Sequence, residues 1–110
     1  MSEKAIRNSS ELAQEAGKGI ALVDFWATWC GPCLMQKPVV EKLADEFAGR
    51  ATVLTCNVDE SQEVAQEFAV FSIPTLVLLR DGEEIERYVG VQSEDRLRKL
   101  LDGACETVQA

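Results

Sequence analysis

The chain has 110 residues, of which 46% are hydrophobic and 27% charged, and its formal net charge is −8 at pH 7. This length and composition predict one globular domain over residues 1–110. The negative charge leaves no basic surface for a nucleic-acid backbone, and no segment has the ~20 apolar residues of a membrane-spanning helix. The first ten residues lack the apolar core of a signal peptide, so a cytoplasmic location is expected.

Four cysteines and the absence of histidine narrow the possible chemistry. Four unevenly spaced cysteines do not resemble the disulfide framework of a small secreted protein. Without histidine, Ser–His and Cys–His nucleophile pairs are excluded, and so is the commonest metal ligand. The two cysteines that lie close together, Cys30 and Cys33, remain as candidates for chemistry.

Before this cysteine pair, the chain predicts a short helix and a buried strand. Ser9 and Ser10 can cap a helix over residues 11–16. Residues 20–26 are apolar on both faces, which is typical of a strand inside a parallel sheet. A weak strand over residues 4–7 precedes both.

After the pair, apolar residues recur at every fourth position and predict an amphipathic helix over residues 33–48. Pro38 lies inside this helix and should kink it. Farther on, Asp81–Gly82 is a strong hairpin signal. The elements make an α/β fold, with a mixed central sheet of about four or five strands flanked by about four helices. The later elements are strands over residues 52–59, 75–79 and 84–91, a helix over residues 61–68, and a last helix from a Ser93 cap to about residue 104.

The Cys30-Gly31-Pro32-Cys33 motif lies where the strand turns into the long helix. The first amides of a helix lack partners and its dipole favours negative charge, so Cys30 is expected to be a partly exposed thiolate. Cys33 lies one turn inside and is shielded. This asymmetry favours two-step exchange, in which Cys30 attacks a substrate disulfide and Cys33 resolves the mixed disulfide.

Two other interpretations of the cysteine pair remain open at this point. The pair could be half of a zinc site, but the other half would need Cys56 and Cys105, which are far apart in the sequence. It could also be a packed thiol pair, although the Gly-Pro turn and the neighbouring Trp29 are unusual in a core.

Several short motifs accompany the pair, and together they extend over nearly the whole chain. They are VDFWATWCGPC (residues 23–33), Pro38 in the helix, NVD (57–59), SIPTL (72–76) and the Gly90 of YVGV (88–91). On these motifs the chain resembles the thioredoxin family.

The resemblance implies a five-stranded mixed sheet, four helices and a cis Ile73–Pro74 bond beside the cysteines. It also implies protein-disulfide reductase activity, with no bound cofactor and no metal. Electrons would arrive from a thioredoxin reductase, or a comparable donor, and pass to client proteins that contain disulfides. The expected protein is a monomer in the cytoplasm, with no nucleic-acid or membrane partner.

The resemblance also implies roles for residues around the cysteines. Asp24 would accept and return the proton of Cys33, a role that suits a buried carboxyl with a raised pKa. The alternative for Asp24 is a carboxylate satisfied by local hydrogen bonds. Trp26 is expected to pack behind the thiols. A mostly apolar client-binding rim around Cys30 would consist of Trp29, Gly31, Pro32, Ile73, Pro74 and Gly90.

Some positions depart from the family pattern. Thr55 stands where many members carry a lysine near the buried acid, and Leu34 replaces a lysine or arginine that is common after the second cysteine. The first departure removes the usual ionic partner of the buried acid, and the second removes a positive charge near the thiols. Of the remaining cysteines, Cys56 is expected to be a buried small hydrophobic residue. Cys105 is expected to be more exposed and able to form an intermolecular disulfide.

The leading functional hypothesis is a cytoplasmic thiol–disulfide oxidoreductase that reduces client proteins. A second hypothesis is a binding module of a larger assembly in which the thiols are incidental, but a scaffold would need neither the cysteine motif nor Asp24. A third is a relative that forms or isomerises disulfides. The direction of exchange depends on the potential of the dithiol against that of its compartment.

Overall fold

The computed structural model describes residues 2–109 of the chain. A five-stranded sheet with strand order β1-β3-β2-β4-β5 forms its centre, and the mixed-sheet prediction is confirmed. No helix in the described part is both long enough and apolar enough to cross a membrane. The elements are β1 (Lys4–Ala5), α1 (Ser9–Ala16), β2 (Ile20–Trp26), α2 (Gly31–Glu46), β3 (Thr52–Asn57), α3 (Gln62–Glu67), β4 (Thr75–Arg80), β5 (Glu83–Val89) and α4 (Glu94–Gln109).

The sheet contains parallel and antiparallel pairs. β1 and β2 both run parallel to β3, while β4 runs antiparallel to β2 and β5 antiparallel to β4. β2 therefore lies at the centre, with a neighbour on each side and helices above and below. This position explains why its sequence is apolar on both faces. Its one charged residue, Asp24, is paired in register with Thr55 of β3 and Leu76 of β4.

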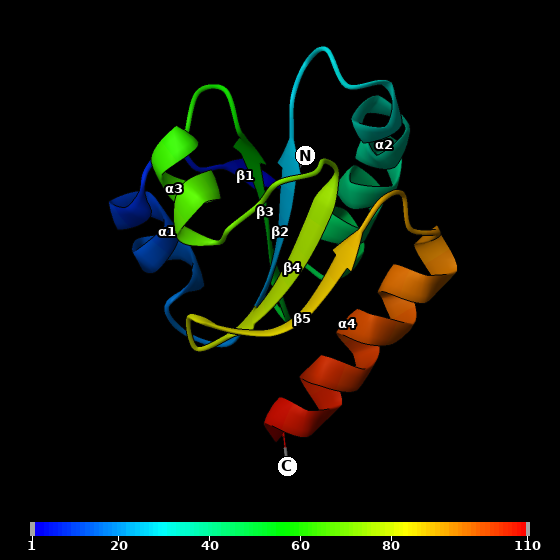
Figure 1. Cartoon of the computed structure of the whole chain (residues 1–110). Helices are drawn as coiled ribbons and strands as arrows, with labels where there is room; N and C mark the ends of the chain where they lie inside the picture. The colour runs from blue at the N-terminus through cyan, green and yellow to red at the C-terminus, as the bar shows by residue number, and fades with distance from the viewer. Residues whose placement is uncertain (1, 110) are drawn as a thin grey trace.

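Helices cover both faces of the sheet, with α1 and α3 on one side and α2 and α4 on the other (Figure 1). The alternating side chains of β2 divide between two hydrophobic cores. Leu22 packs with Leu43 and Leu97 on the face covered by α2 and α4. Val23 packs with Leu12 on the opposite face. The two packed layers thus hold the carboxyl end of β2, where the cysteine loop begins, in place.

Several element boundaries differ from the predicted ones. The N-cap of α1 is Asn8, whose Oδ1 atom accepts a hydrogen bond of 2.8 Å from the Glu11 amide; Ser9 and Ser10 are instead the first two helical residues. The weak first strand is confirmed, although it covers only Lys4–Ala5. The last helix continues beyond residue 104 to Gln109.

Candidate active site

The two cysteines of the motif lie at the turn between β2 and α2. Cys30 is the N-cap of α2 and Pro32 is in its first turn, where a missing amide proton costs nothing. A disulfide joins Cys30 and Cys33, whose Cα atoms are 5.2 Å apart. The Cys33 amide also donates to the Cys30 sulfur at 3.2 Å. The start of α2 therefore holds positive charge density at Cys30 Sγ, which favours a thiolate there once the bond is reduced.

Cys30 is more enclosed than the sequence suggested, whereas Cys33 is shielded as expected. Cys30 is only 5% exposed and Cys33 only 1% exposed, so the expectation of a partly exposed Cys30 is wrong for the disulfide form. The reason is packing that the motif does not reveal. Cys30 and Cys33 share a small cluster with Ala27, and the partly buried Trp26 and Ile73 pack against it. Trp26 thus lies behind the thiols as expected.

The segment before β4 forms the other side of the site. Its Ile73–Pro74 peptide bond is cis, and Cys30 Sγ lies 3.8 Å from the Ile73 carbonyl oxygen. The Thr75 hydroxyl donates to the Ser72 carbonyl and fixes the turn. The Gly90 amide donates to the Pro74 carbonyl oxygen at 2.8 Å. Pro74 is itself buried and Ile73 half-buried, so Ile73 keeps some surface exposed at this turn and Pro74 does not.

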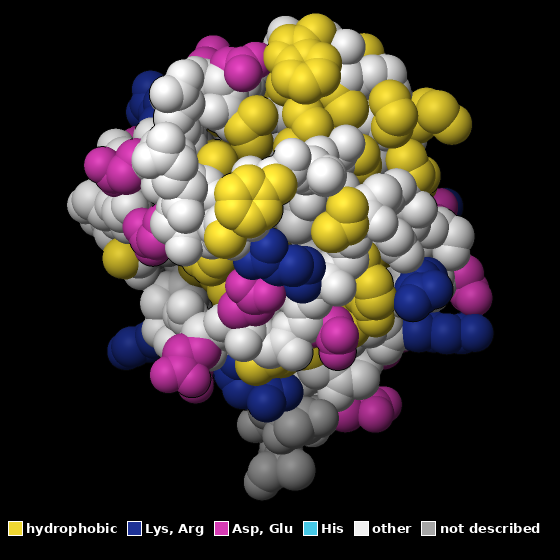
Figure 2. Space-filling model, viewed as in Figure 1, with side chains coloured by type: hydrophobic (Ala, Val, Ile, Leu, Met, Phe, Trp, Pro, Cys, Tyr) yellow, Lys and Arg dark blue, Asp and Glu magenta, His cyan; other side chains and the backbone are white. Residues whose placement is uncertain are grey.

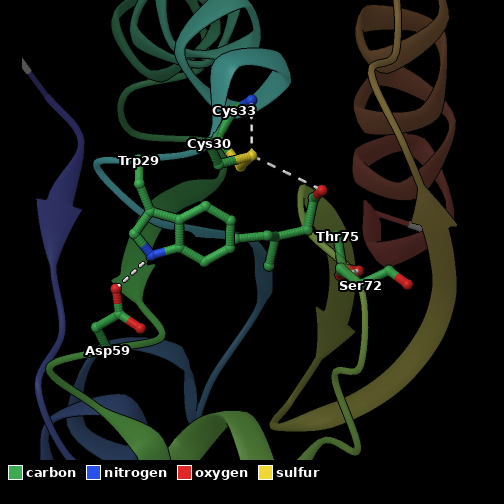
Figure 3. The surroundings of a disulfide bond; sticks show 7 residues. Trp29, Cys30, Cys33, Asp59, Ser72 and Thr75 are labelled. Atoms are coloured by element: carbon green, nitrogen blue, oxygen red, sulfur yellow. Dashed lines mark hydrogen bonds between the residues drawn. A yellow bond between two sulfur atoms is a disulfide. The ribbon is translucent and has the colours of Figure 1, made fainter.

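Apolar side chains are exposed around this end of the molecule. Trp29 is 69% exposed, and its indole N–H points to Asp59 and donates to the carboxylate at 2.7 Å (Figure 3). Phe71, two residues before Ile73, is 93% exposed and was missed by the sequence analysis. Its position directly before the SIPTL motif was the available signal. Hydrophobic side chains gather at the upper end of the face in Figure 2, where the loop after β2 and the start of α2 lie in Figure 1.

Asp24 is buried directly behind the disulfide. Only 2% of it is exposed, and its Oδ1 atom has no hydrogen-bond partner within the described residues. It lines a cavity of about 190 Å³ together with Cys33 and Lys37; Glu3 and Glu41 are the other charged residues of the lining. Burial raises the pKa of the Asp24 carboxyl to about 7, and the nearby charge of Lys37 opposes part of that increase. A carboxyl with this pKa can take up or release a proton near neutral pH.

Lys37 is a second residue that the sequence analysis missed. Thr55 does stand beside Asp24 without a positive charge, as predicted. The positive charge near Asp24 comes instead from Lys37 on α2, which follows Cys33 by one helical turn. Its Nζ atom lies over the Trp26 ring, 4.3 Å from the ring centroid. Attraction between the ammonium group and the ring face stabilises the charged side chain in this position. The spacing of four residues from Cys33 was the available signal, because such residues share one helix face.

The remaining two cysteines lie outside the site. Cys56 is fully buried as predicted, and burial raises its pKa to about 11. Cys105 is 5% exposed and its thiol donates to the Arg50 carbonyl oxygen at 3.7 Å, so the expectation that it is exposed is wrong. The two belong to cores on opposite faces of the sheet. They therefore cannot provide the second pair of ligands for a four-cysteine zinc site.

A redox-active cysteine pair at a helix N-terminus, beside a cis-proline turn and a buried carboxyl, defines the class of thiol–disulfide oxidoreductases. The family model described as Thioredoxin matches residues 4–103. The chain belongs to the thioredoxin family, and thiol–disulfide exchange is its chemistry.

Relatives and solved structures agree with this assignment. The thioredoxin of Staphylococcus haemolyticus is 46% identical over 93 residues, which are 84% of this chain and 89% of the relative. The thioredoxin of Staphylococcus aureus is 48% identical over 84 residues, 76% of this chain and 81% of the relative. A mutant thioredoxin from Halobacterium salinarum superposes with a TM-score of 0.87 at 40% identity, covering 94% of this chain and 90% of that one.

Proposed function

We propose that the protein reduces disulfides of client proteins, with Cys30 as the attacking thiol and Cys33 as the resolving thiol. The observation that supports these roles is the asymmetry of the pair. Cys30 is the N-cap of α2 and faces the cis-proline segment, whereas Cys33 lies inside the first turn and is less exposed. A thiolate at the cap is stabilised by the helix and can meet a client first.

The proposed reduction takes place in two successive thiol–disulfide exchanges. The Cys30 thiolate attacks one client sulfur, forms a mixed disulfide and expels the other client sulfur as a thiolate. The Cys33 thiolate then attacks Cys30 Sγ and releases the second client thiolate. The client disulfide gains two electrons, and the protein is left with the Cys30–Cys33 disulfide.

Asp24 would take the proton of Cys33 before the second exchange. Both residues line the same cavity, and the Asp24 pKa of about 7 lets the ionised carboxylate act as a base near neutral pH. The unpartnered Oδ1 atom supports this role, because a purely structural carboxylate would be held by local hydrogen bonds.

The client would dock on the apolar surface around Cys30. Exposure of Trp29, Gly31 and Pro32, and the half-exposed Ile73 and Gly90, supports this placement. Main-chain atoms next to the cis bond could pair with an extended client segment, as in strand addition. Pro74 is buried, so it would fix the conformation of this turn without contacting the client through its side chain.

We further propose that a thioredoxin reductase, or an equivalent donor, returns the protein to its dithiol form. In this role the protein is an electron carrier, which acts as a monomer in the cytoplasm. The electron-carrier role is supported by membership of a family whose members exchange electrons with a reductase and with disulfide clients.

Reduction of insulin disulfides tests the proposal. With dithiothreitol as the electron source, the protein should accelerate insulin reduction, and Cys30→Ser should abolish the acceleration. With NADPH and thioredoxin reductase, NADPH oxidation should depend on the protein. An absence of acceleration with dithiothreitol would overturn the reductase function. Activity with dithiothreitol alone would show that the donor differs from the reductase tested.

A further inference from the structure

A buried amide on α2, the side chain of Gln36, plays no part in the site described above. Its exposed fraction is 0%. It lies one turn after Cys33, and the other buried residues farther along α2 are apolar. Burial of an amide on such a face is unfavourable unless its polar atoms are hydrogen-bonded. The partners of Gln36 therefore indicate what its amide does.

Both partners belong to the main chain of a single residue, Gln92. The Gln36 Nε2 atom donates to the Gln92 carbonyl oxygen at 3.1 Å, and the Gln92 amide donates to Gln36 Oε1 at 2.7 Å. Gln92 lies in the connection from β5 to α4, residues 90–93, which passes beside α2 (Figure 1). A leucine or methionine at position 36 could pack against this connection but could not hold both its donor and its acceptor.

The hydrogen bonds continue from Gln92 to the cis-proline segment. The Gln92 side-chain Nε2 atom donates to the Gly90 carbonyl oxygen at 3.2 Å. The Gly90 amide in turn donates to the Pro74 carbonyl oxygen at 2.8 Å. Ile73, the residue directly before Pro74, places its carbonyl oxygen 3.8 Å from Cys30 Sγ. A connected set of hydrogen bonds thus runs from the helix that carries the cysteines to the loop and turn that face them.

We infer that Gln36 is a positioning residue for client binding, because it fixes the loop of residues 90–93 against α2. The inference rests on the proposed function, in which Gly90 belongs to the surface that clients contact. Val91, which is 46% exposed in the same loop, would be held in place with it. The side-chain hydrogen bonds of Gln36 go to Gln92 and not to the sulfur atoms, so its effect concerns the fit of a protein client and not the exchange chemistry.

Gln36→Leu is the test, because it removes both hydrogen bonds and keeps a side chain of similar size. With insulin as client, KM should rise about fivefold or more, since a partly buried amide and carbonyl lose their partners. The reaction of the reduced protein with the small disulfide dithiobisnitrobenzoate should keep its wild-type rate. The reduction potential of the cysteine pair should also stay unchanged, because α2 still begins at the same place.

Val53→Ala is the matched control, since Val53 is a buried residue of β3 that packs in the core and not on the loop. It should lower stability without raising KM for insulin. A Gln36→Leu variant with wild-type KM, or one slowed equally toward both substrates, would overturn the inference. A wild-type protein inactive toward both substrates would overturn the proposed function itself.

Hydrogen exchange in the wild-type protein gives a test that does not depend on whether the variant folds. The Gln92 amide donates to a fully buried oxygen of Gln36, so its exchange should be strongly slowed relative to an unstructured peptide. The Val91 amide, one residue earlier, is a suitable internal reference. If the Gln92 amide exchanged as fast as an amide in an unstructured peptide, the inference that Gln36 fixes the loop of residues 90–93 would be wrong.

Discussion

Asp24→Asn should remove a large pH dependence of stability near neutral pH. The wild-type carboxyl is buried behind the disulfide, and desolvation raises its pKa from 3.8 to about 7. The folded protein therefore holds this proton more tightly than the unfolded chain does. Stability from this group is fully present below about pH 4 and is lost as the pH rises through about 7. Asparagine has nearly the same volume and stays neutral throughout.

The magnitude follows from the two pKa values. At about 1.4 kcal/mol for each pKa unit, the full cost of ionising folded Asp24 is about 4 kcal/mol well above pH 7. About 3 kcal/mol of this cost develops between about pH 5 and pH 8, because the unfolded carboxyl is already ionised at the lower value. The unfolding free energy of Asp24→Asn should therefore gain about 3 kcal/mol relative to wild type over that interval. Surface carboxylates such as Glu46 and Glu94, whose pKa values are lowered by Arg98, are common to both proteins and cancel.

Denaturant unfolding of the disulfide forms at about pH 5, 6, 7 and 8 measures this difference directly. Parallel stability profiles for the two proteins would refute the assignment of a raised pKa to Asp24. The same variant tests the proposed proton transfer. Insulin reduction above pH 7 should slow at least about tenfold, because Cys33 has lost its base. An unchanged rate would leave Asp24 with a structural role only.

Three further changes test the remaining features of the site. Cys33→Ser should accumulate a mixed disulfide between Cys30 and insulin, detected on a nonreducing gel, and trapping through Cys33 in Cys30→Ser would reverse the assigned roles. Lys37→Met should raise the pKa of Asp24 further, because it removes an attractive charge, so the loss of stability should shift to higher pH; an unmoved profile would contradict the contact. Cys105 is buried, so an alkylating reagent should modify it only after unfolding, and Cys105→Ala should keep the insulin reductase activity. Rapid labelling of the native protein at Cys105, or loss of most activity in that variant, would contradict this arrangement.

Local chain chemistry accounts for much of what could be predicted from the sequence. A strand that is apolar on both faces can only be central, and residues 20–26 are the central strand β2. The Asp81–Gly82 hairpin joins β4 to β5, because both residues adopt the positive φ that such turns need. The cysteine motif likewise lies at the start of α2, with a proline in its first turn. In each case the governing preference acts within a few neighbouring residues.

Contacts between distant segments decided the rest. The burial of Cys105 depends on packing of α4 against the α2 side of the sheet, which no pattern around residue 105 reveals. The charge beside Asp24 comes from Lys37 on a different element, so the departure at Thr55 did not predict its electrostatic environment. Gln36 appears in the sequence as a polar residue on an apolar helix face. Only its hydrogen bonds to Gln92, 56 residues away, account for that position. Packing selects the partner of Gln36 because burial of an amide is unfavourable unless the segment that lies against it supplies hydrogen bonds.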